Sequence, residues 1–141
     1  MTTFELQLER DGVLIYPNKG TSMLPLIRQG RDLMVIKKLN KRPRKYDAVL
    51  FIRADGKYVL HRIQKVYNDG SYYIIGDNCT TGETVKEDQI IGILTEVKRG
   101  EKGKSIMSSD IKYKLYARFI LLILPLRKLV AKIRWKLAKQ P

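Results

Sequence analysis

Two kinds of side chain in this sequence could together carry out nucleophilic catalysis: a serine hydroxyl and an imidazole. A serine hydroxyl is a weak nucleophile at neutral pH, so it needs a base that takes its proton and donors that stabilise the oxyanion. The chain has one histidine, His61, and a lysine could serve as the base only if desolvation lowered its pKa. His61 is therefore the first candidate base, and Ser22 is the candidate nucleophile.

Ser22 lies in the segment GTSMLP at positions 20–25, which follows a predicted strand. Gly20 permits a close approach of two backbones, and Pro25 stiffens the exit from the segment. The segment could hold a serine at a strand edge. A serine between Gly and Pro is also common in ordinary turns, so the segment alone does not identify a nucleophile.

His61 and Asp77 each allow a catalytic and a structural interpretation. His61 alternates with Val59 and Ile63 along a predicted strand, so it shares a face with apolar neighbours, as a hydrogen-bonded core histidine would. Its ordinary pKa nevertheless suits a base. Asp77 follows the predicted strand 72–75, where a carboxylate could accept the second imidazole proton and fix the tautomer. The alternative for Asp77 is an Asx turn.

The elements expected to position these residues are β-strands. Between residues 13 and 99, short apolar or alternating runs are separated by turn signals, a pattern typical of strands. The runs predict strands at 13–17, 33–38, 48–53, 58–67, 72–75 and 90–97. Asp55-Gly56 and Asn68-Asp69-Gly70 favour tight hairpin turns between consecutive strands, so we expect a meander.

The C-terminal part of the chain has a different pattern. Residues 98–109 are polar and contain glycine, which predicts a linker. Residues 111–124 and 126–139 favour two short helices with a kink at Pro125. A chain of 141 residues suits one core. We therefore expect a β domain over residues 1–99, a linker over 100–110 and a basic amphipathic helical tail over 111–141.

The charge is concentrated in two basic segments. The net charge is +14, from 28 Lys and Arg against 14 acidic residues, and such an excess attracts nucleic acid or an anionic membrane face. The loop 37–45 is either a solvated connector or a polyanion contact. The tail has no acid after Asp110 and its uncharged run 119–126 is too short to span a bilayer. We expect it to lie on an anionic membrane surface, with packing onto the domain or a partner as the alternative and nucleic acid least favoured.

Six short motifs in order resemble the signal peptidase family. They cover most of the predicted β region, and the Ser-Met-x-Pro and Gly-Asp-Asn motifs are the most specific of them. The motifs are GTSMLP at 20–25, QGRD at 29–32, KYDAV at 45–49, HRI at 61–63, GDN at 76–78 and IIG at 90–92.

The resemblance implies a role for each site residue. Ser22 would be the nucleophile and His61 the base, as in the endoplasmic-reticulum and archaeal type, where most bacterial enzymes have Lys. Asp77 would orient His61 and stabilise its charge. The Ser22 N–H would form the oxyanion hole, with Thr21 and Met23 as oxyanion or substrate-binding residues, since Gly20 stands where many relatives have a hydroxyl.

The resemblance also implies a fold and a reaction. The expected fold is mainly β, a curled antiparallel β-barrel-like structure shared with the autocleaving, LexA-like repressor peptidases. The expected function is a serine endopeptidase that cleaves leader or signal-type peptides through an acyl-enzyme, with no metal or organic cofactor. The alternative is a catalytically weak peptide-binding or partner-docking module on the same scaffold. A DNA-associated, self-cleaving regulator is a third possibility, although no helix-turn-helix precedes the β region.

The expected location is cytoplasmic and peripherally membrane-associated. One cysteine, Cys79, excludes an intrachain disulfide and is compatible with a reducing compartment. The first eleven residues mix acidic and apolar side chains, so we expect neither a signal peptide nor the N-terminal anchor typical of the family.

Overall fold

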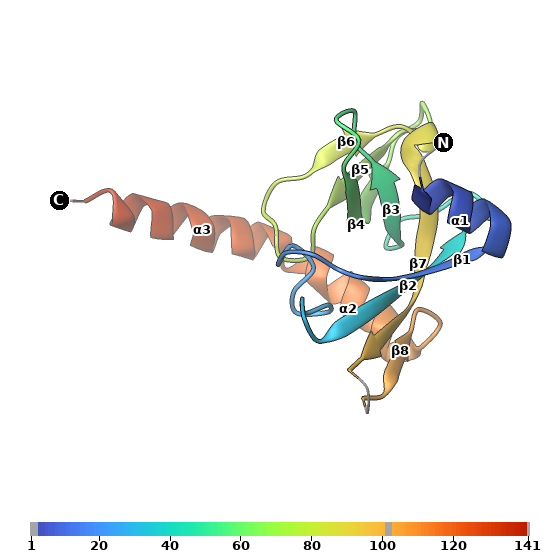
Figure 1. The fold of residues 1–141 in the computed structure, drawn as a ribbon. Coiled ribbons are helices and arrows are strands. Elements are labelled where there is room, and N and C mark those ends of the chain that lie inside the picture. The colour runs from blue at the N-terminus through green and yellow to red at the C-terminus, as the bar shows by residue number, and fades with distance from the viewer. Residues whose placement is uncertain (1–2, 101–102, 141) are drawn as a thin grey trace.

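The computed structural model describes residues 3–100 and 103–140, and its first half forms one helix and most of a sheet (Figure 1). The N-terminal elements are α1 (Thr3–Asp11), β1 (Val13–Pro17), β2 (Asp32–Lys38), β3 (Ala48–Ile52), β4 (Tyr58–Val66), β5 (Tyr72–Ile75) and β6 (Glu83–Val85). The C-terminal elements are the 3-10 turn η1 (Glu87–Gln89), β7 (Ile90–Arg99), β8 (Ser105–Met107), α2 (Ile111–Leu122) and α3 (Leu124–Ala138).

The protein is mainly β, with one antiparallel sheet of eight strands. Its order is β1-β2-β7-β3-β4-β5-β6, and β8 pairs with β7. The mainly β, antiparallel prediction is therefore confirmed. The barrel-like closure is wrong, because β1 and β6 end the strand order without pairing with each other. The sheet is open, with α1 beside β1 at one end of the strand order and β6 at the other (Figure 1).

The predicted meander is present in β3, β4 and β5. Asp55-Gly56 turns β3 into β4, and Asn68-Asp69-Gly70 turns β4 into β5. Both turn glycines have positive φ, at 86° and 89°, the backbone region that glycine adopts most easily. The register sets His61 of β4 opposite Val49 of β3, in the middle of the sheet.

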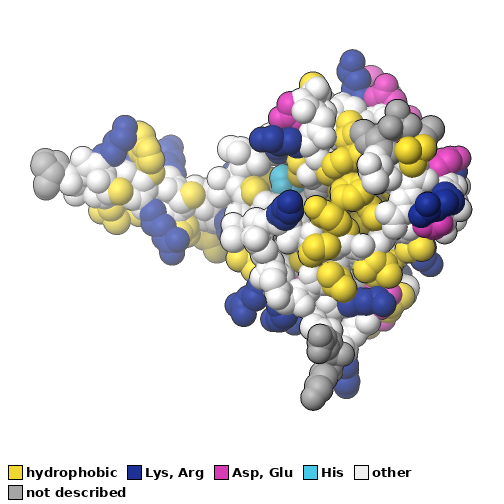
Figure 2. All heavy atoms as spheres, viewed as in Figure 1, with side chains coloured by type: hydrophobic (Ala, Val, Ile, Leu, Met, Phe, Trp, Pro, Cys, Tyr) yellow, Lys and Arg dark blue, Asp and Glu magenta, His cyan; other side chains and the backbone are white. Residues whose placement is uncertain are grey.

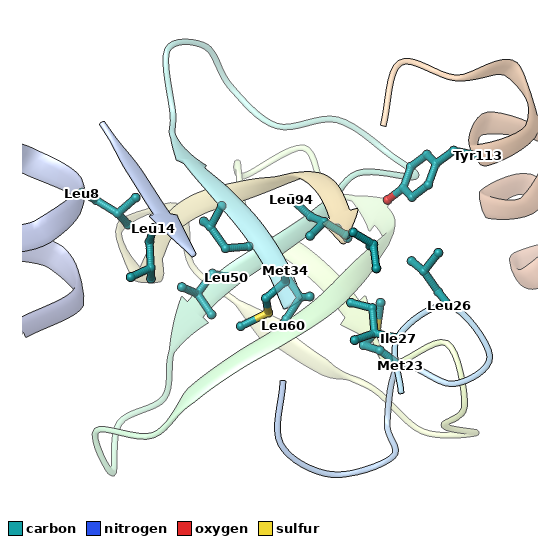
Figure 3. Packing of buried hydrophobic residues seen from close by; sticks show 13 residues of the cluster. Leu8, Leu14, Met23, Leu26, Ile27, Met34, Leu50, Leu60, Leu94 and Tyr113 are labelled. Atoms are coloured by element: carbon teal, nitrogen blue, oxygen red, sulfur yellow. The ribbon is translucent and has the colours of Figure 1, made fainter. Parts of the chain in front are cut away.

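Both faces of the central strands are buried. Along β3, Ala48 and Leu50 face one core cluster, whereas Val49 and Phe51 face the other. The first cluster is closed by Met23, Leu26 and Ile27 of the segment after β1 (Figure 3), and by Tyr113 of α2. The strand alternation that the sequence shows therefore separates two cores, and neighbouring residues of β4 point into different surroundings.

Four elements were not predicted, one of which is the short turn η1. α1 covers the sheet through Leu8, which is 2% exposed, although its other residues are mostly polar. β6 is three residues long, and β8 lies within the expected linker 100–110, where Ile106 pairs with Val97 of β7. β8 is only three residues long and lies in a polar, glycine-containing stretch, so it gave no strand signal of its own, and its order comes from pairing with β7. Positions 101 and 102 of that linker lie outside the described residues.

The two C-terminal helices differ in their surroundings. α2 packs on the sheet through Tyr113, Ala117 and Ile120, and α3 contributes only Leu124 to the interior before it extends away from the domain (Figure 1). The kink falls at Ile123, two residues before Pro125. Within residues 3–100 and 103–140, no helix is long and apolar enough to cross a membrane.

Candidate active site

Gly76 is the point at which the backbone of Ser22 and the imidazole of His61 come close together. A Cβ placed on this buried glycine would lie 2.7 Å from the backbone oxygen of Ser22 and 3.0 Å from Nε2 of His61. The next turn of the chain fixes this arrangement, because the Asn78 N–H donates to the Ser22 oxygen at 2.8 Å. Strand β4, the segment 20–25 and the turn after β5 therefore bring Ser22 and His61 against one glycine.

The Ser22 segment is held by its backbone. The Asn78 side-chain amide donates to the Thr21 oxygen at 3.1 Å, and the Gly20 N–H donates to the Gln29 side chain at 2.7 Å. Ser22 itself is half-buried. Across residues 3–100 and 103–140, the Ser22 N–H donates to no acceptor, so it can bind an oxyanion.

Met23 and Thr21 differ in their exposure beside Ser22. Met23 is completely buried, and its sulfur accepts the Asp77 N–H at 3.5 Å. Its side chain therefore anchors the segment, and the role of Met23 as an oxyanion or substrate-binding residue stays a prediction. Thr21 is exposed beside Ser22, so its hydroxyl can reach a ligand.

His61 is buried, with 8% of its surface exposed, and it stacks edge-on against Phe51 at 6.2 Å between ring centres. Burial lowers the pKa of His61, and the nearby Arg53 lowers it further, while Glu83 and Asp77 act in the opposite direction. The imidazole is therefore neutral at pH 7, the form that can accept a proton. In Figure 2 the chain's histidine, in cyan, reaches the surface beside an apolar patch in yellow.

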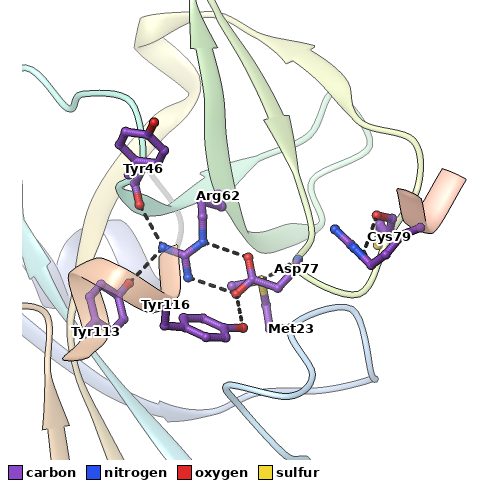
Figure 4. Close-up of polar contacts among 8 residues, drawn as sticks. Met23, Tyr46, Arg62, Asp77, Cys79, Tyr113 and Tyr116 are labelled. Atoms are coloured by element: carbon purple, nitrogen blue, oxygen red, sulfur yellow. Dashed lines mark hydrogen bonds and ion pairs between the residues drawn. The ribbon is translucent and has the colours of Figure 1, made fainter. Parts of the chain in front are cut away.

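Asp77 does not hydrogen-bond Nδ1 of His61. Its carboxylate accepts two hydrogen bonds from Arg62, at 2.8 and 2.9 Å, and a third from the Tyr116 hydroxyl at 2.7 Å (Figure 4). Nδ1 of His61, by contrast, is buried with no hydrogen-bond partner among the described residues. The expectation that Asp77 accepts the second imidazole proton is therefore wrong in this structure.

The alternation of β4 explains this difference. His61 and Arg62 are neighbours, so their side chains point to opposite faces of the strand. Arg62 points toward α2, where it donates to the Tyr113 hydroxyl at 3.2 Å and lies 5.6 Å from the centre of the Tyr116 ring. A carboxylate that pairs with Arg62 on that face cannot also hold His61 on the other.

Tyr113 and Tyr116 of α2 support the site, although none of the sequence motifs includes them. Their spacing of three residues places both on one face of α2. Burial raises the pKa of Tyr116, and the Asp77 carboxylate raises it further, so the hydroxyl stays protonated and donates. Tyr113 is 7% exposed and Tyr116 is half-buried against the domain, so this face of the tail, for which the sequence predicts a membrane surface, packs on the domain.

Cys79 is a further neighbour that the sequence did not indicate. A Cβ on Gly76 would lie 2.7 Å from its sulfur, so the thiol borders the same space as His61. Arg127 of α3 donates to the Cys79 oxygen at 3.2 Å, which ties the helical tail to this turn (Figure 4). In the described part of the chain, no three His, Cys, Asp or Glu side chains are grouped so that they could hold a metal ion.

Comparison with known proteins adds no relative: no model of a known family matches this sequence, and no curated protein matches it significantly. The chemistry of the site is therefore inferred from its own residues. They comprise a serine with an unbonded backbone N–H and a neutral imidazole, both against Gly76, and a turn that is held by a buried ion pair.

Proposed function

We propose that this protein is a serine endopeptidase in which Ser22 is the nucleophile and His61 the general base. The observation that carries the proposal is the shared contact at Gly76, which brings the Ser22 backbone and His61 Nε2 together from segments 39 residues apart in the chain. The ordered motifs that resemble the signal peptidase family and the antiparallel sheet support it. In this proposal the open sheet is a variant of the signal peptidase and LexA-like fold.

The proposed reaction proceeds through an acyl-enzyme. Ser22 Oγ attacks the carbonyl carbon of the scissile bond while His61 takes the hydroxyl proton, and the Ser22 N–H stabilises the oxyanion. His61 then returns that proton to the leaving amine as the C–N bond breaks. In the second half, His61 takes a proton from water, the resulting hydroxide attacks the acyl carbon, and the proton returns to Ser22 as the acid product leaves.

The proposed substrates are leader or signal-type peptides. The apolar patch beside the histidine in Figure 2 suits an extended chain with apolar side chains, and the resemblance implies small side chains next to the cleaved bond. The proposed location is the cytoplasmic face of a membrane, because the helical tail combines basic and exposed apolar side chains.

The test is hydrolysis of leader-type peptides by the purified chain, followed by mass spectrometry. We expect discrete cleavage by the wild type and by Ser105→Ala, a control that removes an exposed hydroxyl from β8, and none by Ser22→Ala. Peptides that stay intact with the wild type, or equal cleavage by Ser22→Ala, would refute the proposal.

A second candidate is a peptide-binding or partner-docking module on the same scaffold. The observation that favours it is the unpartnered Nδ1 of His61, because no acid in the described residues fixes its tautomer. This module would bind leader-type peptides with equal affinity in the wild type and in Ser22→Ala, and would cleave them in neither.

A further inference from the structure

A basic hollow lies between the loop that follows β2 and helix α2. Its volume is about 640 Å³, and its lining holds eight Lys and Arg side chains and one carboxylate, Asp47. Asp47 is already engaged, because its carboxylate accepts the Arg44 N–H at 2.8 Å. Among the described residues, six of the eight cations form no ion pair with a carboxylate: Lys37, Lys41, Arg44, Lys45, Lys114 and Arg118.

A second hollow adjoins the first. It has a volume of about 510 Å³, and its lining includes Lys65 of β4 and Lys128 of α3, with no carboxylate. Lys45 lines both hollows, so the two lie next to each other beside the helical tail. Like charges that gather around two adjoining hollows are costly without a counter-charge, which indicates an anionic ligand with several separate charges.

An apolar stripe runs along the exposed side of the same two helices. Its members recur at intervals of three or four residues, the spacing that places them on one face. The stripe consists of Ile111, Leu115, Phe119, Leu122, Leu126, Leu129, Ile133 and Leu137, all at least 48% exposed. The helical hydrogen bonding continues across the kink, because the Ile123 N–H donates to Phe119 and the Arg127 N–H to Ile123.

A row of basic side chains on the same two helices runs along one flank of this stripe. Lys114 and Arg118 are four residues apart on α2 and line the first hollow, and Lys128 of α3 lines the second. Lys132 and Lys136 continue the row at the same spacing. Helical periodicity therefore places the apolar stripe beside the cations that border the hollows.

We propose that the two hollows bind the phosphates of anionic phospholipids while the stripe enters the boundary between headgroups and acyl chains. A phosphate headgroup supplies the missing counter-charge, and a bilayer covers an exposed apolar helix face next to a basic one. Nucleic acid would meet the charges but would leave eight large apolar side chains in water. The occupant is therefore an anionic bilayer.

This docking would also orient the candidate active site. The buried face of α2 supplies Tyr113 and Tyr116 to the Arg62–Asp77 pair, and Arg127 of α3 holds the Cys79 oxygen. The helices that meet the bilayer thus contact the turn beside His61. The inference goes beyond the proposed peptidase and does not depend on it, since no residue of the docking surface performs the reaction.

The test is co-sedimentation of the full chain with vesicles, of phosphatidylcholine alone or with phosphatidylglycerol. We expect binding only to the vesicles with phosphatidylglycerol. The hollow variant Lys41→Gln/Arg44→Gln/Lys45→Gln should bind roughly a hundredfold more weakly, at about fivefold per charge removed. The control Lys19→Gln/Lys57→Gln/Lys104→Gln removes three exposed charges elsewhere and should lose much less.

Three further arms complete the test. The stripe variant Leu126→Gln/Leu129→Gln should also lose binding, and free inorganic phosphate should not displace the wild type. Ser22→Ala should bind as the wild type does, which separates this inference from the peptidase. Equal losses in the hollow and control variants, equal binding to both kinds of vesicle, release by free phosphate, or binding to duplex DNA without binding to vesicles would overturn the inference.

Discussion

The two faces of β4 carry neighbouring residues that differ in their hydrogen bonding. On one face, Arg62 is fully buried, and its donors reach Asp77, Tyr113 and the backbone of Tyr46. On the other face, His61 is also buried, but Nδ1 has no partner in the described structure and Nε2 lies against Gly76. One strand thus holds a polar group that is satisfied and one that is not.

This difference separates a residue that supports the structure from one that can take part in catalysis. A buried ion pair in which each guanidinium nitrogen forms a hydrogen bond contributes a fixed geometry, and it holds the turn of Asp77 against β4 and α2. An imidazole that is kept neutral and unbonded is free to exchange a proton with a group that enters the site. Substitutions on the first face should therefore act on stability, and those on the second on activity.

The largest expected effect is on activity. We predict that His61→Gln lowers kcat/KM for a leader-type peptide by about 10²- to 10⁴-fold, the contribution of a general base. The melting temperature should change little, because Nδ1 makes no hydrogen bond that could be lost. Peptide cleavage assays and a thermal melt measure the two quantities. If His61→Gln unfolds, but its folded molecules still cleave the peptide at the wild-type rate, the assignment of stability to one face of β4 and activity to the other would be contradicted.

The next effect is on stability. Arg62→Met should lower the free energy of unfolding by about 3–5 kcal/mol, because it leaves the Asp77 carboxylate buried without its ion-pair partner. The double variant Arg62→Met/Asp77→Leu should recover part of that loss, since neither charge remains. Urea unfolding measures both values. A loss below about 1 kcal/mol, the size expected for an exposed pair, would show that the ion pair is not structural.

A smaller loss is expected at the contact with α2. Tyr116→Phe removes one hydrogen bond to a buried carboxylate and should cost about 1.5–3 kcal/mol. Tyr67→Phe is the matched control, because the Tyr67 hydroxyl bonds to none of the described residues and its loss should have little effect. Equal unfolding free energies for the two variants would mean that α2 does not support the site through this bond.

The smallest effect concerns pH. His61 must be neutral to act as a base, and its pKa lies below the ordinary value, so activity should fall only as the pH drops below about 6.5. Arg53→Gln removes a charge that lowers this pKa, so the acid limb should move to higher pH. Glu83→Gln should move it to lower pH. Profiles of kcat/KM against pH test the signs, and shifts in the same direction for both variants would contradict them.

Folding stability should depend on pH in the same direction as activity does. A buried histidine with a lowered pKa resists protonation in the folded state, so its stabilising effect is present above the unfolded pKa of about 6.5. That stabilisation is lost as the pH falls through the folded pKa. His61→Gln should remove this part of the pH dependence of unfolding.

Much of the sheet could be predicted because local signals and tertiary structure agree. The alternation in β4 and the Asp-Gly turns are local features, and both hairpins were placed correctly. The short strand β8 and the polar helix α1 could not be predicted, because β8 depends on pairing with β7 and α1 on the packing of two side chains, Phe4 and Leu8, against the domain. The prediction that the sheet closes was wrong, because closure depends on where the edge strands end in space.

The site was predictable in part for a similar reason. The motifs placed Ser22 and His61 near each other, but they carried no information about which face of β4 the Asp77 carboxylate would join. Arg62 decides this, since it is the buried cation and it follows His61 by one residue. The basic composition of the tail favoured a membrane surface for it, whereas the face of α2 that carries Tyr113 and Tyr116 packs on the domain.

The most direct test of the Ser22–His61 site is covalent labelling by a serine-directed phosphonate probe, with the modified peptide mapped by mass spectrometry. We predict that Ser22 is labelled in the wild type, at a rate that rises with pH through one ionisation below about 6.5, and is not labelled in His61→Gln. No labelling of the wild type, or labelling of Ser22 at the same rate in His61→Gln, would contradict a site in which His61 activates Ser22.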